Sequence, residues 1–373
     1  MSQRKEIELA FLGDLALGLG VRGTVDRYGA SFPYQGTKEA YLSSHFVVAN
    51  FEGFVSDRRD LSRRQASMAV PSAHAEGLID SGINVLCLAN NHIMDAGEKE
   101  AENTENFLQT AGFLHYGVGR NLVHATSPAV REKNGVRVAF VGAADFSRIH
   151  AGNDRYGVAP ADPKSLLDSV ALCKTLADVI VVSLHADLEF VSVPAPWRVE
   201  LCRRLVDAGA DLVVQHHPHV LQGVERWNEG LIAYSLGNYV FQVSGNRYQS
   251  RHEGTNQGVI LKVLIRIGET RKLSWELIPT IIDDEHVPRL LEGAERTRAV
   301  QTIQNRSDIL SDSNAIADQW RCRARHELAG GIADTYWALR RRNPASAMAE
   351  ISRLIGQAEN RRLFAACMPR FIT

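Results

Sequence analysis

The chain has 373 residues, of which 45% are hydrophobic and 23% are charged, so it can bury a sizeable core in one large domain or two modest ones. Its 42 Lys and Arg balance 43 Asp and Glu, and the formal net charge of -1 excludes a bulk attraction to nucleic acid or to an anionic membrane. The five cysteines include no C-x-x-C pair, and we predict that they are reduced packing residues.

No apolar segment is long enough to cross a membrane, because a spanning helix needs about 20 predominantly apolar residues. Asp14 interrupts the N-terminal apolar segment, and His185 and Asp187 end the run that begins at residue 179. The N-terminal segment is also too short for the core of a signal peptide. We therefore expect a soluble cytoplasmic protein with no membrane anchor and no nucleic-acid partner.

Short β-branched runs alternate with helix-forming stretches over the first 283 residues, which indicates an α/β fold. The runs predicted as strands are residues 7–13, 45–53, 83–92, 137–145, 178–187, 210–219, 231–241 and 258–267. The stretches predicted as helices are residues 72–81, 98–111, 163–177 and 195–208, the last with Gly209 as its C-cap. Because such sheets bring ligand chemistry to the carboxyl ends of their strands, the polar residues after the first seven runs should converge on one edge.

The first two strand ends carry carboxylates and an amide. Asp14 directly follows the first run, where a buried carboxylate is costly unless it meets a cation or hydrogen-bond donors. A turn or helix-cap role is the alternative for Asp14 taken alone. Asn50 and Glu52 flank Phe51 at the second strand end, so both side chains lie on one face if the strand is still extended there.

The loop "SDRRDLSRRQ" that follows this strand end is rich in arginine. Guanidinium groups bind carboxylates and phosphates through paired hydrogen bonds, so we predict that the loop contacts an anionic substrate. A solvated loop is the alternative. The predicted substrate-binding residues here are Arg58, Arg59, Arg63 and Arg64.

The third strand end, "LANNHIMDAG", is a dense group of polar residues after a buried strand. An isolated Asn-His pair in a loop is usually structural, but the density of this group favours a functional site. Its members are Asn90, Asn91, His92 and Asp95. At the later strand end "VVSLHADLEF", strict alternation would point His185, Asp187 and Glu189 to one face.

Three imidazoles follow the run "LVVQ", at His216, His217 and His219, and Pro218 ends regular strand pairing between them. Imidazoles together with carboxylate and amide oxygens form a mixed ligand set that suits Mn, Fe, Zn or a similar divalent ion. No cysteine lies nearby, which argues against a structural zinc site. The turn in "IAYSLGNYVF" places Ser235 and Asn238 beside this group. We predict that they bind substrate, and a purely structural role in the turn is the alternative.

After about residue 283 the chain becomes rich in Arg, Ala, Glu and Gln, with Trp320, Trp337 and Leu339 as apolar anchors. We predict a first domain over residues 1–283 and a helical C-terminal extension over residues 284–373 that packs on it. The cluster Arg340, Arg341 and Arg342 is a polyanion patch or, more simply, a solvated helix end.

The ordered set "FLGDLALG", "ANFEG", "LANNHIMDAG", "SLHADLEF", "DLVVQHHPHVLQGVE" and "IAYSLGNYVF" resembles the CapA family of poly-γ-glutamate capsule proteins, within the calcineurin-like metallophosphoesterase superfamily. The resemblance covers roughly residues 7 to 283. It implies a four-layer αββα sandwich of two mixed sheets, with the active site at the strand ends.

The resemblance also implies roles for single residues. The implied metal ligands are Asp14, Asn50 or Glu52, Asn91, His185, His217 and His219. His92 resembles the general acid of the superfamily, and we expect His217, Asp95 and Glu189 to serve the catalytic chemistry. Two-metal phosphoesterases carry a His where this chain has Ala16, a Gly-Asp where it has Asn50-Phe51-Glu52, and a Glu where it has Ile93. We therefore expect one divalent ion (Mn, Zn, Fe, Mg or Ca), with two ions as the alternative.

These parts suit a metal-dependent enzyme that acts on a peptide, poly-γ-glutamate or a related amide or carboxylate substrate by histidine acid-base chemistry. The expected partner is an anionic peptide or polymer. Three alternatives are peptide epimerisation by proton removal at an alpha carbon, phosphoester hydrolysis, and a non-catalytic accessory role in capsule synthesis.

Overall fold

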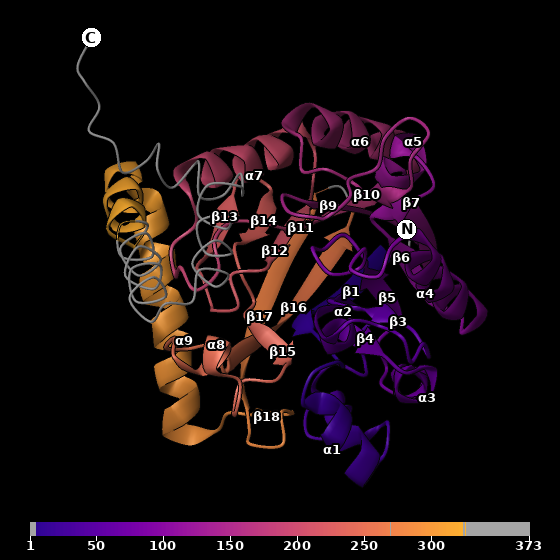
Figure 1. The fold of residues 1–373 in the computed structure, drawn as a ribbon. Helices are drawn as coiled ribbons and strands as arrows, with labels where there is room; N and C mark the ends of the chain where they lie inside the picture. The colour runs from indigo at the N-terminus through magenta and orange to yellow at the C-terminus, as the bar shows by residue number, and fades with distance from the viewer. Residues whose placement is uncertain (1–4, 269, 324, 326–373) are drawn as a thin grey trace.

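We describe the chain from a computed structural model, whose described residues are 5–268, 270–323 and 325. Within these residues, eighteen strands and nine α-helices are labelled (Figure 1), and residues 313–323 form a further helical segment. The helices are α1 (Val21–Tyr28), α2 (Arg63–Met68), α3 (Ser72–Ala75), α4 (Glu98–Thr110), α5 (Leu122–Thr126), α6 (Pro163–Leu176), α7 (Pro196–Ala208), α8 (Arg247–Ser250) and α9 (Gly293–Asp308).

Two mixed sheets form the centre of the fold. The larger consists, in spatial order, of β18 (Pro288–Leu290), β17 (Lys272–Ile282), β16 (Gln257–Ile267), β1 (Lys5–Leu15), β2 (Phe46–Phe51), β5 (Val85–Cys87) and β6 (Leu114–Tyr116), with β15 (Asn238–Val240) also paired to β1. The smaller consists of β13 (Val224–Trp227), β14 (Gly230–Ala233), β12 (Leu212–His216), β11 (Val179–His185), β9 (Val136–Ala144) and β8 (Ala129–Lys133). Two short pairs, β3 (Phe54–Val55) with β4 (Ala69–Val70) and β7 (Val118–Gly119) with β10 (Gly157–Val158), complete the strands.

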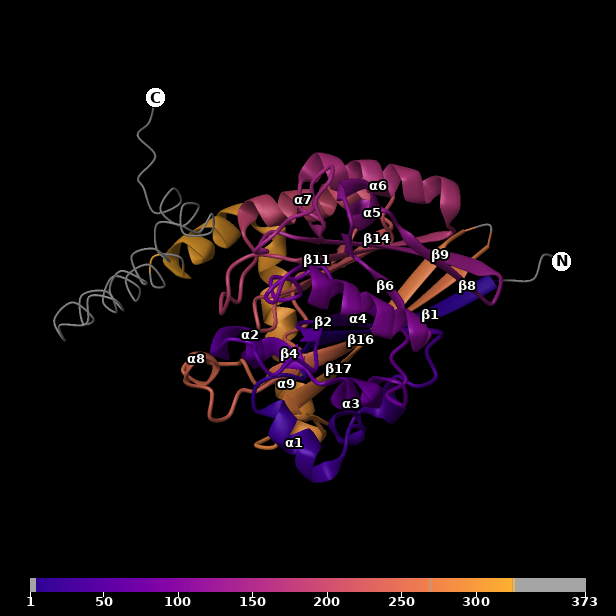
Figure 2. The ribbon, with the colours of Figure 1, turned by 45° about the vertical axis from the view of Figure 1, so that its right-hand side comes forward.

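The sheets stack face to face, with α6 and α7 outside the smaller sheet and α4 outside the larger one (Figure 2). The predicted four-layer αββα sandwich is therefore confirmed. Alternation along β11 shows how the sequence specifies these layers. Val179 and Val181 pack in the core shared with the larger sheet, whereas Ile180 and Val182 pack in the core beneath α6 and α7.

The predicted helices agree with α4, α6 and α7 to within two residues. Gly209 ends α7 with a φ of +120°, as expected of a C-cap glycine. The predicted helix at 72–81 is wrong in length, because α3 passes at Glu76 into the short 3-10 turn η3 (Glu76–Leu78). At Gly77 a Cβ atom would lie 1.9 Å from the Ala30 carbonyl oxygen, so this close approach requires glycine, a poor helix former.

The larger sheet extends past residue 283, since β18 pairs antiparallel with β17. Helix α9 then packs against β13 and β17 (Figure 1), and residues 313–323 are helical. Trp320 is buried, as its predicted anchoring role requires. The predicted anchors Trp337 and Leu339, and the cluster at residues 340–342, lie outside the described residues.

Three cysteines, Cys87, Cys173 and Cys202, are buried free thiols, which agrees with a packing role. Cys322 is exposed instead, and Cys367 lies outside the described residues. Within the described part of the chain, every helix is too short or too polar to cross a bilayer.

Candidate active site

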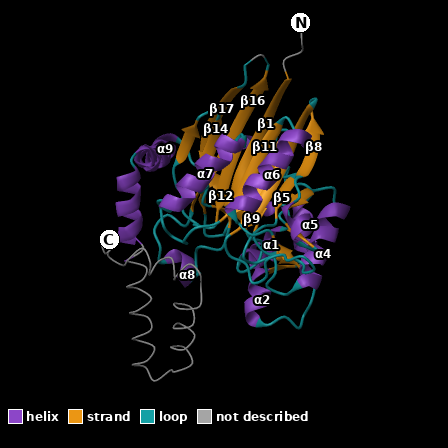
Figure 3. Cartoon of the chain, turned by 90° about the horizontal axis from the view of Figure 1, so that it is seen from above, coloured by secondary structure: helices purple, strands orange, loops and turns teal. Residues whose placement is uncertain are grey.

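The polar residues that follow the strands come together at one end of both sheets, where Figure 3 shows the connecting loops. The register of the larger sheet places Asp14 of β1 level with Asn50 of β2 and with Asn238 of β15. In the smaller sheet, His185 of β11 is level with His216 of β12. The strand ends are thus level within each sheet, and the contacts of Asn50 with His185 and of Asp14 with the His217 N–H join the two sheets.

Two glycines allow β1 and β15 to approach closely beside Asp14. A Cβ atom on Gly13 would lie 2.2 Å from the carbonyl oxygen of Gly237. Gly237 has a φ of +67°, in the left-handed region that favours glycine, and its carbonyl accepts a 3.0 Å hydrogen bond from the Asp14 N–H. The turn that contains Gly237 therefore fixes the position of Asp14.

Asp14 is a fully buried carboxylate surrounded by donors. Its Oδ1 accepts a 2.8 Å hydrogen bond from Asn50 Nδ2, and its Oδ2 accepts one of 3.2 Å from the His217 backbone N–H. The Nδ1 atoms of His216 and His219 each lie 3.4 Å from one of its oxygens. Burial opposes ionisation of Asp14, but hydrogen bonds to His216 and His219 outweigh it and hold the pKa well below its usual value.

Glu52 is the carboxylate with the fewest partners in the site. It is 1% exposed, and within the described residues neither of its oxygens accepts a hydrogen bond. The Nε2 atoms of His92 and His219 lie 3.7 Å and 3.8 Å from Glu52 Oε1, too far for hydrogen bonds. Burial is the main cause that raises the pKa of Glu52. A buried carboxylate without donors is costly, and a bound cation would satisfy it.

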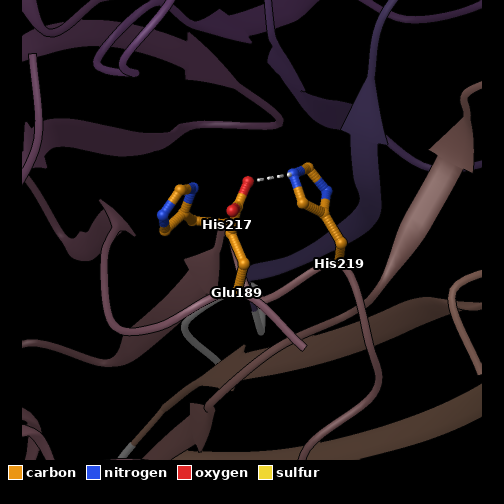
Figure 4. Close-up of side chains that lie close together, drawn as sticks. All are labelled: Glu189, His217 and His219. Carbon is orange, nitrogen blue, oxygen red and sulfur yellow. Dashed lines mark ion pairs between the residues drawn. The ribbon is translucent and has the colours of Figure 1, made fainter. Parts of the chain in front are cut away.

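Two groups of three side chains offer ligand atoms that all lie within 4.8 Å of one another. One group is Asp14, Glu52 and His185, and all three are buried. The other is Glu189, His217 and His219, in which the Glu189 carboxylate lies between the two imidazoles (Figure 4). Carboxylate oxygens and imidazole nitrogens are the donors that Mn, Zn and Fe prefer, so these residues fit a divalent ion.

The protonation of the imidazoles reflects the surrounding charge. Burial lowers the pKa of His185 well below its usual value, so His185 is neutral, the form that ligates metals. Burial also disfavours the charged form of His219, yet Glu52, Asp14 and Glu189 raise its pKa to about 10. The His219 ring therefore lies between Asp14, which is near its Nδ1 atom, and Glu52 and Glu189, which are near its Nε2 atom.

Two asparagines bracket the His185 ring. Its Nε2 lies 3.0 Å from Asn91 Oδ1, and its Nδ1 lies 3.1 Å from Asn50 Nδ2. Asn50 also has a buried Oδ1 atom with no partner within the described residues. Both amides thus stand beside the Asp14, Glu52 and His185 donors, where they can complete a ligand shell.

His92 and Asp95 form a dyad at the rim of the site. His92 Nδ1 lies 2.7 Å from Asp95 Oδ2, and His92 Nε2 faces Glu52. The His92 side chain is 28% exposed, whereas that of Asp95 is 3% exposed. Asn90 holds the loop, because its Oδ1 accepts hydrogen bonds from the N–H groups of His92 and Ile93. A solvent-accessible imidazole oriented by a carboxylate has the geometry of a general acid or base.

Comparison with known proteins decides the family. The profile of the family described as "Bacterial capsule synthesis protein PGA_cap" matches residues 8–243, more than half of the chain. The chain belongs to this bacterial capsule synthesis family. The match includes every strand end described above.

Two relatives by sequence and one solved structure are similar to the chain. "Capsule biosynthesis protein CapA" of Bacillus anthracis is 30% identical over 271 residues, which are 68% of this chain and 66% of that protein. "PGA biosynthesis protein CapA" of Bacillus subtilis (strain 168) is 32% identical over 246 residues, which are 65% of each protein. The chain thus spans slightly less than two thirds of each relative. The solved 5'-nucleotidase from Candida albicans SC5314 has a TM-score of 0.43 and 11% identity, over 82% of this chain and 58% of that one.

This capsule-family site lacks donors at two positions where the two-metal phosphoesterase pattern has them. Ala16 and Ile93 are both buried among apolar residues, so their side chains are part of the core. The second donor group, Glu189, His217 and His219, comes instead from the loops after β11 and β12. The loop after β12 is conformationally strained, since His217 and His219 have φ angles of +93° and +54° around Pro218.

One prediction at the β11 end is wrong. Strict alternation does not continue beyond His185, because the strand ends there and Asp187 adopts a φ of +77°. The Asp187 carboxylate points to the Ala195 N–H at 3.1 Å and to Arg198 Nε at 3.5 Å, under α7. Glu189 returns to the site, where its Oε1 lies 3.7 Å from His219 Nε2 and its Oε2 accepts a hydrogen bond from the Tyr248 hydroxyl.

Arg198 is a buried residue behind the site that has no local signal in the sequence. It is 1% exposed and forms ion pairs with Asp145, after β9, and Asp187, after β11. Burial disfavours its charged form, but Asp145 and Asp187 outweigh burial and raise its pKa. This triad ties α7 to the loop after β9 and to the loop after β11, which carries Glu189.

Replacing Arg198 with methionine should lower the free energy of unfolding by about 3–5 kcal/mol, because Asp145 and Asp187 would remain buried without their cation. Urea denaturation followed by circular dichroism measures this change. Arg204→Met, at an exposed position of the same helix, is the matched control and should change stability by less than about 0.5 kcal/mol. Equal stability of the two variants would contradict the role of the triad.

Ser235 and Asn238, both predicted to bind substrate, are buried. Ser235 Oγ accepts a 3.2 Å hydrogen bond from the Gly237 N–H within the turn. Asn238 Oδ1 lies 2.9 Å from His219 Nδ1, and its Nδ2 donates to the Thr255 carbonyl at 2.9 Å. These contacts orient His219, and substrate contact by either residue remains a prediction.

The four predicted substrate-binding arginines differ in their partners. Arg58 pairs with Asp60 at 2.7 Å and with Glu100 at 3.4 Å, so its charge is neutralised. The other three side chains are exposed and have no carboxylate partner within the described residues. They are Arg59, Arg63 and Arg64.

Proposed function

We propose that this capsule-family protein is a metal-dependent enzyme that hydrolyses amide bonds in an anionic glutamyl chain. The observation that supports the proposal most is the buried Glu52 carboxylate. Within the described residues it accepts no hydrogen bond, and it lies beside Asp14, His185 and His219. The ligand residues are Asp14, Glu52, His185, Glu189 and His219, with Asn50 and Asn91 beside them. A divalent ion bound there would polarise a carbonyl oxygen and stabilise the negative charge that develops on it.

The proton transfers are assigned to the chain's own imidazoles. His92, held by Asp95 and open to solvent, delivers a proton from Nε2 to the departing amide nitrogen as the carbon–nitrogen bond breaks. His217 accepts a proton from the attacking water. Asp95 keeps the His92 ring in the orientation that points Nε2 toward Glu52 and the ligand residues.

The substrate class is inferred from charge and family. The exposed guanidinium groups beside the site favour a chain of carboxylates, and the two relatives are named for capsule and PGA biosynthesis. A γ-linked glutamyl chain offers both the carboxylates and the amide bonds that the site could act on.

Mass spectrometry of a γ-linked glutamyl oligomer after incubation with the protein tests this proposal. We expect shorter oligomers with the protein as prepared with Mn²⁺ or Zn²⁺, no shortening after EDTA treatment, and recovery when the metal is added back. Unchanged length with metal-loaded protein would contradict hydrolysis. A changed D/L ratio at constant length would instead identify epimerisation, phosphate release from a phosphoester would identify a phosphatase, and no reaction would favour an accessory role.

A further inference from the structure

The backbone carbonyl of Asp95 joins three segments beside His92. It accepts a 3.1 Å hydrogen bond from Arg148 Nη1, in the loop after β9, and a 3.2 Å hydrogen bond from Gln65 Nε2, in α2. The side chain of the same Asp95 holds His92. The Arg148 guanidinium is therefore tethered next to the His92–Asp95 dyad.

The guanidinium of Arg148 still has N–H donors with which it can bind an anion. Its side chain is exposed, and only one of its N–H groups has a hydrogen-bond acceptor within the described residues. No carboxylate in the described part of the chain forms an ion pair with it, whereas Arg58, Arg198 and Arg203 all have carboxylate partners. Its loop is held by Ser147, whose Oγ donates to the Ile149 carbonyl at 3.1 Å and accepts from the Ile149 N–H at 3.3 Å.

Helix α2 brings further positive charge to the same place. Gln65, which shares the Asp95 carbonyl with Arg148, directly follows Arg63 and Arg64. Both arginines are exposed, and the first turn of α2 has no acidic residue. We call Arg63, Arg64 and Arg148 the basic rim.

We propose that Arg148 is the centre of a carboxylate-binding subsite in the basic rim, and that it places the adjoining amide of a bound chain beside His92. A guanidinium binds a carboxylate through two parallel hydrogen bonds, which fixes orientation as well as position. In a γ-linked glutamyl chain, each carboxylate is attached to the carbon that carries the amide nitrogen. In an α-linked chain, the carboxylate is at the end of the side chain. The subsite therefore prefers the γ linkage. This inference rests on the proposed function, from which the glutamyl substrate class is taken.

Binding of a fluorescein-labelled γ-linked glutamyl oligomer to EDTA-treated protein, followed by fluorescence anisotropy, tests the subsite without turnover. Arg148→Gln should weaken binding about tenfold or more, as expected when a charged hydrogen-bond donor is lost. Arg148→Lys keeps the positive charge but cannot form the two parallel hydrogen bonds, so it should recover only part of the affinity. Arg298→Gln, at an exposed position of α9, makes the same change in net charge and should bind like the wild type. The α-linked oligomer should bind more weakly to the wild type and lose little when Arg148 is changed.

Wild-type affinity in both Arg148 variants, with thermal unfolding showing that both are folded, would overturn the proposal. Equal losses in Arg148→Gln and Arg298→Gln would also overturn it, because the effect would then be one of net charge. The experiment separates the subsite from the proposed reaction. If metal-loaded wild type binds the oligomer through Arg148 but never cleaves it, the hydrolytic function fails and the subsite stands.

Discussion

Replacing Asp14 with asparagine should abolish stable binding of a divalent ion and lower turnover by more than about 100-fold, since even changes to residues that only orient metal ligands cost about 10–100-fold. Asp14 is fully buried, and its two oxygens meet Asn50, His216, His219 and the His217 N–H. An asparagine preserves the shape but removes the negative charge that a cation requires. We therefore expect the variant to lose its bound metal while it remains folded.

Metal analysis of the purified variant and thermal unfolding with added Mn²⁺ or Zn²⁺ measure this effect. An ion at a concentration ~100 times its Kd should stabilise the wild type by about 2.7 kcal/mol and the variant hardly at all. Asp211→Asn is the matched control, because Asp211 is also buried and accepts a 2.8 Å hydrogen bond from the Ile180 N–H, but lies at the start of β12. A control that loses its ion as readily as Asp14→Asn would refute the specific role of Asp14.

Replacing His92 with glutamine should lower kcat by about 10²–10⁴-fold while the bound metal is retained, because general acid catalysis contributes a factor of that size. His92 is accessible to solvent, points Nε2 into the site, and is oriented by Asp95 through a 2.7 Å contact. Asp95→Asn leaves the imidazole in place and should cause a smaller loss.

The control for this change is His74→Gln. His74 Nε2 lies 2.9 Å from Asp26 Oδ1, so it forms a second histidine–carboxylate pair, in α3 and away from the strand ends. Turnover of His74→Gln should match that of the wild type. Retention of full kcat by His92→Gln, with normal metal content, would remove His92 from the mechanism.

The fold and most of the candidate site follow from local sequence pattern. Apolar β-branched runs that end abruptly in Asp14, Asn50, His185 or His216 predict both the strands and the convergence of their ends, because the register of parallel neighbours places those ends level. The dyad of His92 and Asp95 lies within one turn of chain, so it too has a local signal.

Other features depend on contacts between distant segments or on where a strand ends. Arg148 meets Asp95, and Arg198 meets Asp145, across 53 residues in each case, and nothing in the local sequence indicates either pair. Strand β17 (Lys272–Ile282) was not predicted, because its first residues are mostly exposed and lack a strong apolar pattern. The orientation of Asp187 could not be predicted, since it depends on β11 ending at His185 and on the positive φ angle that follows.

The most direct test of the central claim is an anomalous-diffraction map from crystals of this protein soaked in Mn²⁺. We predict a peak among the ligand atoms of Asp14, Glu52 and His185, which all lie within 4.8 Å of one another. A map with Mn²⁺ bound elsewhere and none among these three side chains would contradict the claim that the strand ends enclose a divalent ion.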